Sequence, residues 1–135
     1  MSGSVLFDST IGLLEQSLDL RNRSHRMLSS NIANAETPGY AARHLKFEKA
    51  LHAAFDPETE KMEATDEDHF GFVGTLDAVE GEVEVSGGAG EGNGVRMQEE
   101  MAKLSENQIK YEAATRMLSR KFASLQYVIQ EASKS

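Results

Sequence analysis

The sequence predicts a mainly α-helical fold. Long N- and C-terminal helices form an antiparallel coiled-coil-like pair, and a small β-rich, partly flexible insert lies between them in the chain. Apolar residues recur at alternating spacings of three and four near both ends of the chain, whereas the middle lacks this period. The charge divides in the same way: residues 56–94 carry one Lys and twelve Asp or Glu, a balance of −11, while residues 1–55 and 95–135 come to +1 and +2. The 135 residues therefore form one helical domain with an acidic insert.

The first segment, residues 1–35, is expected to supply the N-terminal helix, which covers about residues 9–35. Apolar residues in this helix recur at the spacing of the a and d positions of a coiled coil and form a seam along one face. Leu13, Leu20 and Met27 form a second row beside this seam, so the apolar stripe is wider than one partner helix needs. The seam consists of Ile11, Leu14, Leu18, Leu28 and Ile32, with Arg21 and His25 as its polar members.

The last segment, residues 95–135, is expected to supply a longer helix. No Pro or Gly follows Arg96, and a helix of about 36 residues would be about 54 Å long. Gln108 and Thr115 interrupt the apolar seam and are expected to restrict its register. Apolar residues outside the seam, such as Ile109, favour association with further helices. The apolar seam consists of Met97, Met101, Leu104, Tyr111, Leu118, Phe122, Leu125 and Ile129.

The stretch SSNIANAETPGY, residues 29–40, ends the first helix and turns the chain. Pro38 has a fixed φ and pushes Thr37 out of the helical region. Gly39 follows as the residue that is free to take a positive φ. Pro-Gly at the two central positions predicts a type II turn from Thr37 to Tyr40.

Two asparagines precede this turn, and a short mixed segment follows it. Asn31 and Asn34 lie three apart on one side of the last helical turn, where their amides can bond carbonyls left free at the helix end. Residues 36–55 are expected to form the post-helix turn, an extended piece from Ala41 to Leu45 and a short helix from Phe47 to Phe55.

The middle insert, residues 56–94, has the pattern of strands and a linker. Valine and glycine alternate with glutamate from Val79 to Val85, which is typical of a strand. The tract GGAGEGNG, residues 87–94, is typical of a flexible linker and fits neither G-x-G-x-x-G nor G-K-[ST]. A phosphate-binding loop is therefore not expected there.

No catalytic residue, cofactor site or metal site is predicted, and the protein is expected not to be an enzyme. The chain has no cysteine, and its four histidines lack H-x-x-x-H spacing. An acidic metal-binding module within residues 56–70 stays open as an alternative, although a solvated acidic run is the simpler interpretation.

Composition also argues against nucleic-acid binding and membrane insertion. A nucleic-acid-binding protein needs a basic face, and none is visible in a chain of net charge −8. No stretch approaches the ~18 apolar residues of a membrane span, so no direct span is predicted. Residues 1–8 have neither a basic segment nor a long apolar run, which predicts that no signal peptide is cleaved.

Residues 29–40, which we call the corner, and the sequence that follows them resemble a known protein family. SSNIANAETPGYAAR, residues 29–43, resembles the N-terminal signature of the bacterial flagellar axial proteins, the rod and hook family. EEMAKLSENQIKYEAATRMLSRK, residues 99–121, is similar to the C-terminal segment of proteins of the proximal rod. Gly94 and Arg96 depart from the family, which commonly has Thr and Asp there. The signature is matched in order by Ser30, Asn31, Ile32, Ala33, Asn34, Thr37, Pro38, Gly39 and Tyr40.

The resemblance implies a structural subunit of the flagellar basal body. Such a subunit assembles with itself and with other rod proteins, through its terminal helices, into the tubular rod of the periplasm. The implied partners are the other flagellar rod proteins, the adaptor joining rod to membrane ring, and the flagellar export gate. Export would use the flagellar type III apparatus. The implied subunit-interaction motif is Asn31, Asn34, Thr37, Pro38, Gly39 and Tyr40. The alternative is a self-contained coiled-coil adaptor outside the flagellum.

Overall fold

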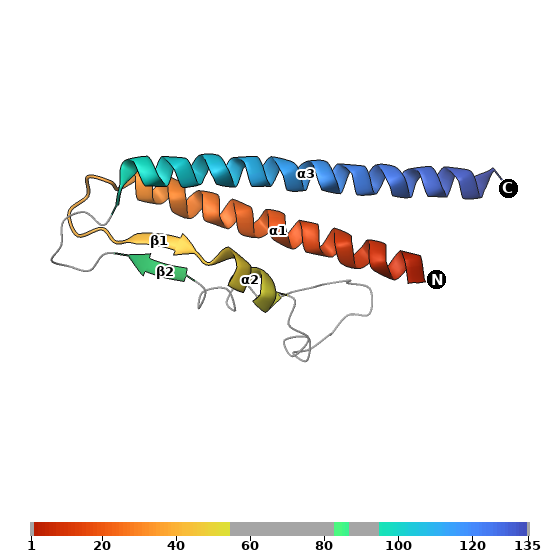
Figure 1. Ribbon diagram of the computed structural model, residues 1–135, viewed down its shortest axis with the longest axis horizontal. Helices are drawn as coiled ribbons and strands as arrows, with labels where there is room; N and C mark the ends of the chain where they lie inside the picture. Colours follow the sequence, from red (N-terminus) through yellow and green to blue (C-terminus); the bar gives the residue numbers. More distant parts are fainter. Residues whose placement is uncertain (1, 55–82, 87–94, 135) are drawn as a thin grey trace.

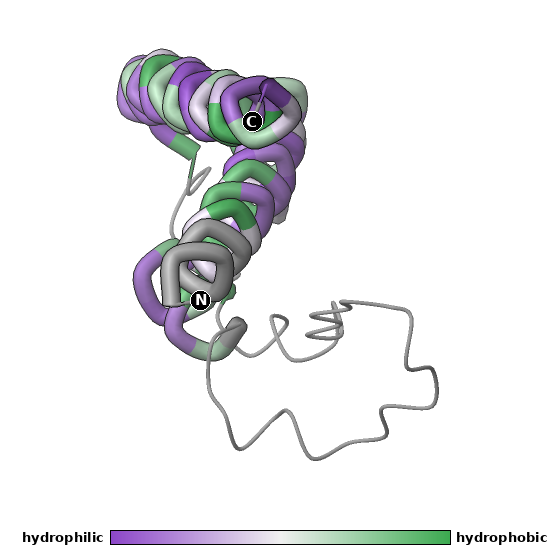
Figure 2. The backbone as a smooth tube through the Cα atoms, turned by 90° about the vertical axis from the view of Figure 1, so that its right-hand side faces the viewer, coloured by the Kyte–Doolittle hydropathy of each residue, from purple (hydrophilic) through white to green (hydrophobic). Residues whose placement is uncertain are grey.

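Two long antiparallel helices, α1 (Ser2–Ala33) and α3 (Met97–Ser133), form the body of the molecule (Figure 1). Asn31, near the end of α1, bonds Glu100, near the start of α3, so the helices run in opposite directions. Figures 1 and 2 show them inclined to one another, with α3 running past the N-terminal end of α1. This confirms the predicted helical pair. The computed structural model describes residues 2–54, 83–86 and 95–134.

A small antiparallel strand pair and a short helix lie on the side of α1 away from α3 (Figure 1). Strand β1 (Ala42–Leu45) pairs antiparallel with β2 (Val83–Ser86), with Ala42 opposite Ser86. Helix α2 (Phe47–Ala54) follows β1 directly. The extended piece and the short helix expected after the corner are both confirmed.

The apolar core lies where α2 and β1 meet α1. Leu20 of α1 and Ala50 of α2 are buried, with exposed fractions of 5% and 0%, and Leu45, Phe47 and Leu51 pack against them. Leu20 belongs to the second apolar row of the N-terminal helix, so α2 covers part of the surface that one partner helix leaves open. Full burial of a large apolar side chain such as Leu20 contributes about 1.5–3 kcal/mol.

The N-terminal helix differs from its prediction at both ends and at one seam position. It begins at Ser2 rather than near residue 9, and it ends at Ala33 rather than Ala35. His25, predicted in the seam, is exposed. The apolar seam residues fare better: Leu28 is buried, and Ile11, Leu14, Leu18 and Ile32 are half-buried.

The row of α3 that faces α1 is only partly the predicted one. Four predicted residues are half-buried: Leu104, Tyr111, Leu118 and Leu125. The prediction is wrong for four others, which are 41–60% exposed: Met97, Met101, Phe122 and Ile129. The adjacent row is covered instead, since Glu100, Asn107 and Ala114 are buried and Lys121 is half-buried.

Polar contacts explain why α3 faces α1 with a row next to the predicted one. Glu100 accepts a hydrogen bond from Asn31, and Asn107 bonds Arg21. A rotation of α3 that brought Met101 toward α1 would leave buried polar groups without these partners, and an unpaired buried polar group costs about 1–3 kcal/mol. The added apolar contact would not offset several such losses.

The start of α3 lacks a side-chain cap. Arg96 is the N-cap residue and makes no capping hydrogen bond, while its Nη1 lies 3.0 Å from Glu99 Oε1. Glu99 and Glu100 lie in the first turn, where the helix dipole favours negative charge, and the ion pair offsets the positive charge of Arg96 at this end. Within the described ranges, no helix has both the length and the apolar character needed to cross a membrane.

Several predictions fall outside the described residues. They are the strand between residues 79 and 82, the glycine linker at 87–94 and the acidic run at 56–70. The strand is confirmed only for Val83–Ser86.

Candidate functional site

Asn31 is the centre of a buried polar cluster that ties the post-helix strand to both long helices. Its side chain is fully buried at 0% exposure. Nδ2 donates to the Arg43 carbonyl and to Glu100 Oε2, at 2.9 Å each. Oδ1 accepts from the Arg43 N–H at 3.1 Å and from the Tyr40 hydroxyl at 3.2 Å. Both donors and both acceptor positions of the amide are therefore used.

The pairing with Arg43 imitates a neighbouring strand. Asn31 bonds both the N–H and the C=O of that residue, as the backbone of an adjacent strand would. A side chain of α1 thus satisfies the backbone of β1 at this position, which a buried strand edge requires. The consequence is that β1 is held at a fixed place against the end of α1.

Glu100 joins this cluster from α3. Its side chain is 3% exposed, and its Oε1 lies 2.7 Å from His44 Nε2 on β1 and 3.6 Å from Lys103 Nζ. His44 Nε2–H donates to the carboxylate and so cannot also accept from Lys103, whose ammonium instead pairs with Glu100. We call the set the polar joint: Asn31, Tyr40, His44, Glu100 and Lys103, with the backbone of Arg43.

The polar joint favours the ionised form of Glu100. Burial acts to raise the pKa of this carboxyl group, but hydrogen bonds from Asn31 and His44, and the charges of His44 and Lys103, outweigh it and lower the pKa. The carboxylate is therefore a charged acceptor that three elements share.

The exposed half of the corner closes the end of α1. Asn34 Nδ2 donates to the Ser30 carbonyl at 2.8 Å, and its Oδ1 accepts from the Thr37 hydroxyl at 3.2 Å. The Tyr40 N–H donates to the Thr37 carbonyl at 3.3 Å, and Gly39 has φ 78°. These features confirm the predicted type II turn.

A second polar contact lies further along the helix pair. Asn107 Nδ2 donates to the Arg21 carbonyl at 2.9 Å, and Arg21 Nη1 lies 3.4 Å from Asn107 Oδ1. The Arg21 guanidinium also lies over the Phe47 ring of α2, 3.6 Å from its centroid, a cation–π contact. Burial lowers the pKa of Arg21, an effect that the charge of Glu106 opposes. Arg21 therefore connects three helices.

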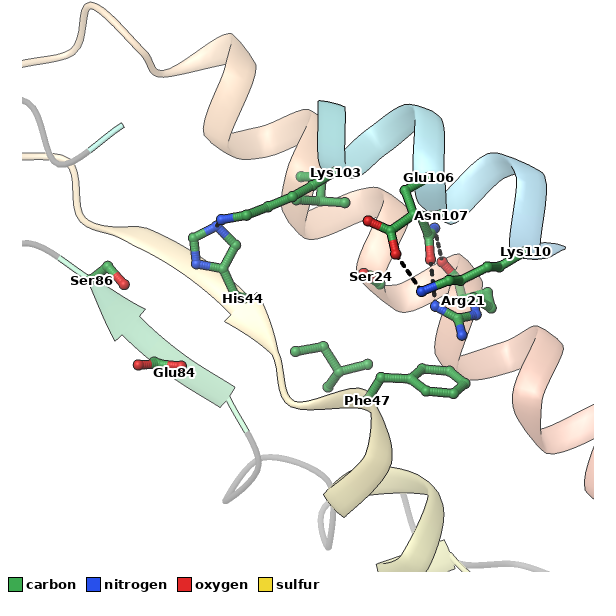
Figure 3. A pocket seen from close by; sticks show the side chains of 12 residues that line it. Arg21, Ser24, His44, Phe47, Glu84, Ser86, Lys103, Glu106, Asn107 and Lys110 are labelled. Carbon is green, nitrogen blue, oxygen red and sulfur yellow. Dashed lines mark hydrogen bonds and ion pairs between the residues drawn. The ribbon is translucent and has the colours of Figure 1, made fainter. Parts of the chain in front are cut away.

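A hollow of about 350 Å³ lies between these two contacts, among α1, α3 and the two strands (Figure 3). Figure 3 shows Lys103 and Lys110 of α3 on one side and Glu84 and Ser86 of β2 on the other. Its charged side chains are largely paired, for example Lys110 with Glu106. In the part of the chain that the structure describes, no group of three or more His, Asp or Glu residues could hold a metal ion.

The structure divides the predicted interaction motif into an inner and an outer part. Asn31 is buried and Tyr40 is half-buried, and both serve contacts within the chain. Thr37, Pro38 and Gly39 are exposed, and Asn34 is half-buried beside them.

Sequence reasoning missed Glu100, His44 and Asn107. One signal was present: Glu100, Asn107 and Lys121 recur at multiples of seven in one row of the C-terminal helix. Their partners, however, lie 56 to 86 residues away in the chain, so no local pattern identifies them.

The fold and the corner together define a mainly helical protein with a turn held at the junction of its two long terminal helices. No protein-family model matches the chain. It is 34% identical over 129 residues to the flagellar basal body rod protein FlgB of Bacillus subtilis, covering 92% of this chain and 95% of that protein.

Two further relatives carry the same name. The chain is 32% identical over 126 residues to FlgB of Cereibacter sphaeroides, covering 91% of this chain and 95% of the relative. It is 29% identical over 123 residues to FlgB of Aeromonas hydrophila, covering 90% and 93%. The chain belongs to the FlgB family of flagellar basal body rod proteins.

Proposed function

We propose that this chain is a structural subunit of the proximal rod of the flagellar basal body, and that it assembles with copies of itself and with other rod proteins through its terminal helices. Family membership supports the location, and the surface of α3 supports the mechanism. The observation that carries the proposal is the amount of apolar side chain that α3 leaves exposed after pairing with α1. The most exposed are Met101, Ile109, Met117, Phe122, Tyr127, Val128 and Ile129, at 50–68%.

Part of this surface forms a second seam on α3. The half-buried row of Leu104, Tyr111, Leu118 and Leu125 touches α1 on one side only. On its other side lie Met101, Phe122 and Ile129, which are exposed. With the polar Gln108 and Thr115 at two of its positions, the combined row has the alternating three and four spacing of a coiled-coil seam. A further helix from a neighbouring subunit fits this seam, and contiguous apolar surface of this kind favours association.

The outer part of the corner is the second proposed contact. Thr37, Pro38 and Gly39 are exposed at the end of the molecule where β1 leaves α1. Asn34 holds the turn in shape through Thr37. We assign contact with neighbouring subunits to this exposed turn, and we assign Asn31 and Tyr40 the supporting role of fixing its direction.

The proposed partners are supported by the family membership. They are other flagellar rod proteins, the adaptor between rod and membrane ring, and the flagellar export gate, which passes the chain into the periplasm without cleavage of a signal peptide. Contacts between unlike faces of neighbouring subunits generate an open helical array rather than a closed ring, as a tubular rod requires.

The test replaces exposed apolar residues of the second seam. A strain that lacks this protein is complemented with the Phe122→Glu/Ile129→Glu double variant. We expect loss of motility and of rods in isolated basal bodies with normal helical content, because both side chains are already in water. Gln126→Glu/Gln130→Glu adds the same two negative charges at exposed positions of the same helix and is expected to swim normally. Normal rods in the double variant would refute the assembly role of this seam.

The runner-up is a self-contained coiled-coil adaptor outside the flagellum. It predicts that deletion leaves motility intact and that the chain is absent from isolated basal bodies. An acidic metal-binding module in residues 56–70 is a third candidate, which calorimetric titration with calcium or zinc would detect.

A further inference from the structure

The covered seam of α3 contains an unusual choice of side chains. Glu100 and Asn107 are seven residues apart and only 2% and 5% exposed, although an apolar pair would bury more apolar surface. Neither belongs to the signature corner. We propose that these two residues set the register of α3 against α1, and thereby fix the axial position at which the open rows of α3 are presented to neighbours.

Each of the two residues meets a partner that is itself fixed by another element. Glu100 meets Asn31, which the backbone of β1 holds at Arg43. Asn107 meets Arg21, which lies against Phe47 of α2. Asn31 and Arg21, the polar partners on α1, are therefore held in place by contacts that do not involve α3.

The apolar residues of the seam cannot select one register of α3 against α1. Leu104, Leu118 and Leu125 recur at multiples of seven with Tyr111 between them, so a slip by one heptad places apolar against apolar again. Connectivity does not select the register either, because ten residues separate β2 from α3 and an extended chain of that length reaches about 33 Å.

The polar row, in contrast, is satisfied in one register. A slip by one heptad in one direction puts Ala114 opposite Arg21 and removes the carboxylate from His44. The opposite slip moves Asn107 away from Arg21 and removes the Glu100 carboxylate from Asn31. In each direction buried polar groups lose the partners that they have in the observed register, which is how a single buried Asn specifies register in coiled coils.

The inference deepens the proposed function but is tested on the isolated monomer, so its failure would not affect the assembly experiment. Spin labels are placed at Asp19→Cys and Ala123→Cys, both exposed positions, in a chain without native cysteine. Pulsed dipolar spectroscopy then reports one distance for the parent chain. A slip of one heptad moves α3 by about 10 Å along its axis.

We expect Asn107→Leu to keep its helical content and to show a second distance, and Asn107→Leu/Glu100→Leu to show it more strongly. Asn107→Asp retains an acceptor for the Arg21 guanidinium and is expected to keep one distance. Gln108→Leu adds the same apolar side chain at an exposed position and is the matched control.

A single unchanged distance in both leucine variants would overturn the proposal. If Asn107→Leu loses its helical signal, Asn107→Ala removes the same hydrogen bonds without adding volume. A folded Asn107→Ala with two distances supports the register role. Loss of helix in that variant as well would overturn the proposal, since the residue would then hold the pair together rather than select its register.

Discussion

At the scale of single residues, two asparagines three positions apart have different roles. Asn34 binds the end of its own helix, as expected from its position after Ser30. Asn31 instead points into the molecule and connects Arg43, Tyr40 and Glu100. The sequence predicts that both are polar groups at a helix end, but it does not predict which one is buried, because that depends on a partner 69 residues away.

This difference predicts different costs of substitution. Asn31→Ala removes one hydrogen-bond donor from the buried Glu100 carboxylate and the side-chain partner of both the N–H and the C=O of Arg43, so we expect a loss of about 3 kcal/mol of unfolding free energy. Asn34→Ala, the matched control, loses solvent-exposed hydrogen bonds and should cost under ~1 kcal/mol. Urea unfolding of the whole chain, followed by circular dichroism, measures both. Equal costs would contradict the buried role of Asn31.

The carboxylate of Glu100 makes the polar joint sensitive to acid. Its pKa in the folded chain is lowered from the usual 4.5. The group therefore adds stability above that value, and this stability is lost as pH falls through the lower folded pKa. We expect wild type to exceed Glu100→Gln in unfolding free energy at pH 7, with the gap narrowing below about pH 4.5.

Thermal unfolding at a series of pH values measures this gap. Glu99→Gln, at an exposed position in the same helical turn, is the control. Its unfolding free energy should change with pH in the same way as that of wild type. A gap between wild type and Glu100→Gln that stays constant down to pH 3 would show that the carboxylate charge does not stabilise the joint.

At the scale of elements, the periodicity of the sequence predicts well which segments form helices. It predicts less well which faces of the two long helices pack against each other. Both long helices, the turn, β1 and α2 follow from spacing and from Pro38 and Gly39. The covered row of α3 does not, because two neighbouring rows share Leu104, Tyr111, Leu118 and Leu125 and both have coiled-coil spacing. The choice between them depends on Arg21 and Asn31, whose partners are visible only in three dimensions.

The turn after α1 allows a prediction that separates backbone strain from crowding. Gly39 has φ 78°, and nothing lies within 4 Å of the position that a Cβ would take. Gly39→Val should therefore lower stability of the turn by about 1–2 kcal/mol through backbone strain alone. Gly39→Asn should be milder, because Asn tolerates a positive φ.

Complementation of a deletion strain then compares the two variants. We expect Gly39→Val to impair rod assembly with normal expression and Gly39→Asn to retain more motility. If Gly39→Val swims like the parent, the conformation of this turn has no part in assembly.

At the scale of the whole molecule, the two ends of the helix pair differ in how many of their side chains are buried. Near the polar joint, Leu28, Asn31 and Glu100 are all buried. At the far end of α3, Tyr127, Val128 and Ile129 are 59–64% exposed, and the helix runs past α1 (Figure 1). Local stability follows the density of buried contacts, so the two ends should open at different rates.

Hydrogen exchange on a verified monomer measures this difference. We expect slow exchange for α1 amides between Leu20 and Asn31 and fast exchange in α3 beyond Lys121. The fast region should become protected when the chain associates with neighbours, because its apolar surface is then covered. Uniform protection along both helices of the monomer would contradict an incomplete terminal surface.

The bidentate pairing of Asn31 with β1 also has a mechanical consequence. Hydrogen bonds are directional, whereas apolar contacts between helices allow shear with little change in energy. A torque carried along the long helices would therefore load the strands mainly through one amide and one carboxylate, Asn31 and Glu100. The hydrogen bond between Asn31 and Glu100 resists shear between α1 and α3 as well, so the polar joint is a stiff connection among β1 and the two long helices.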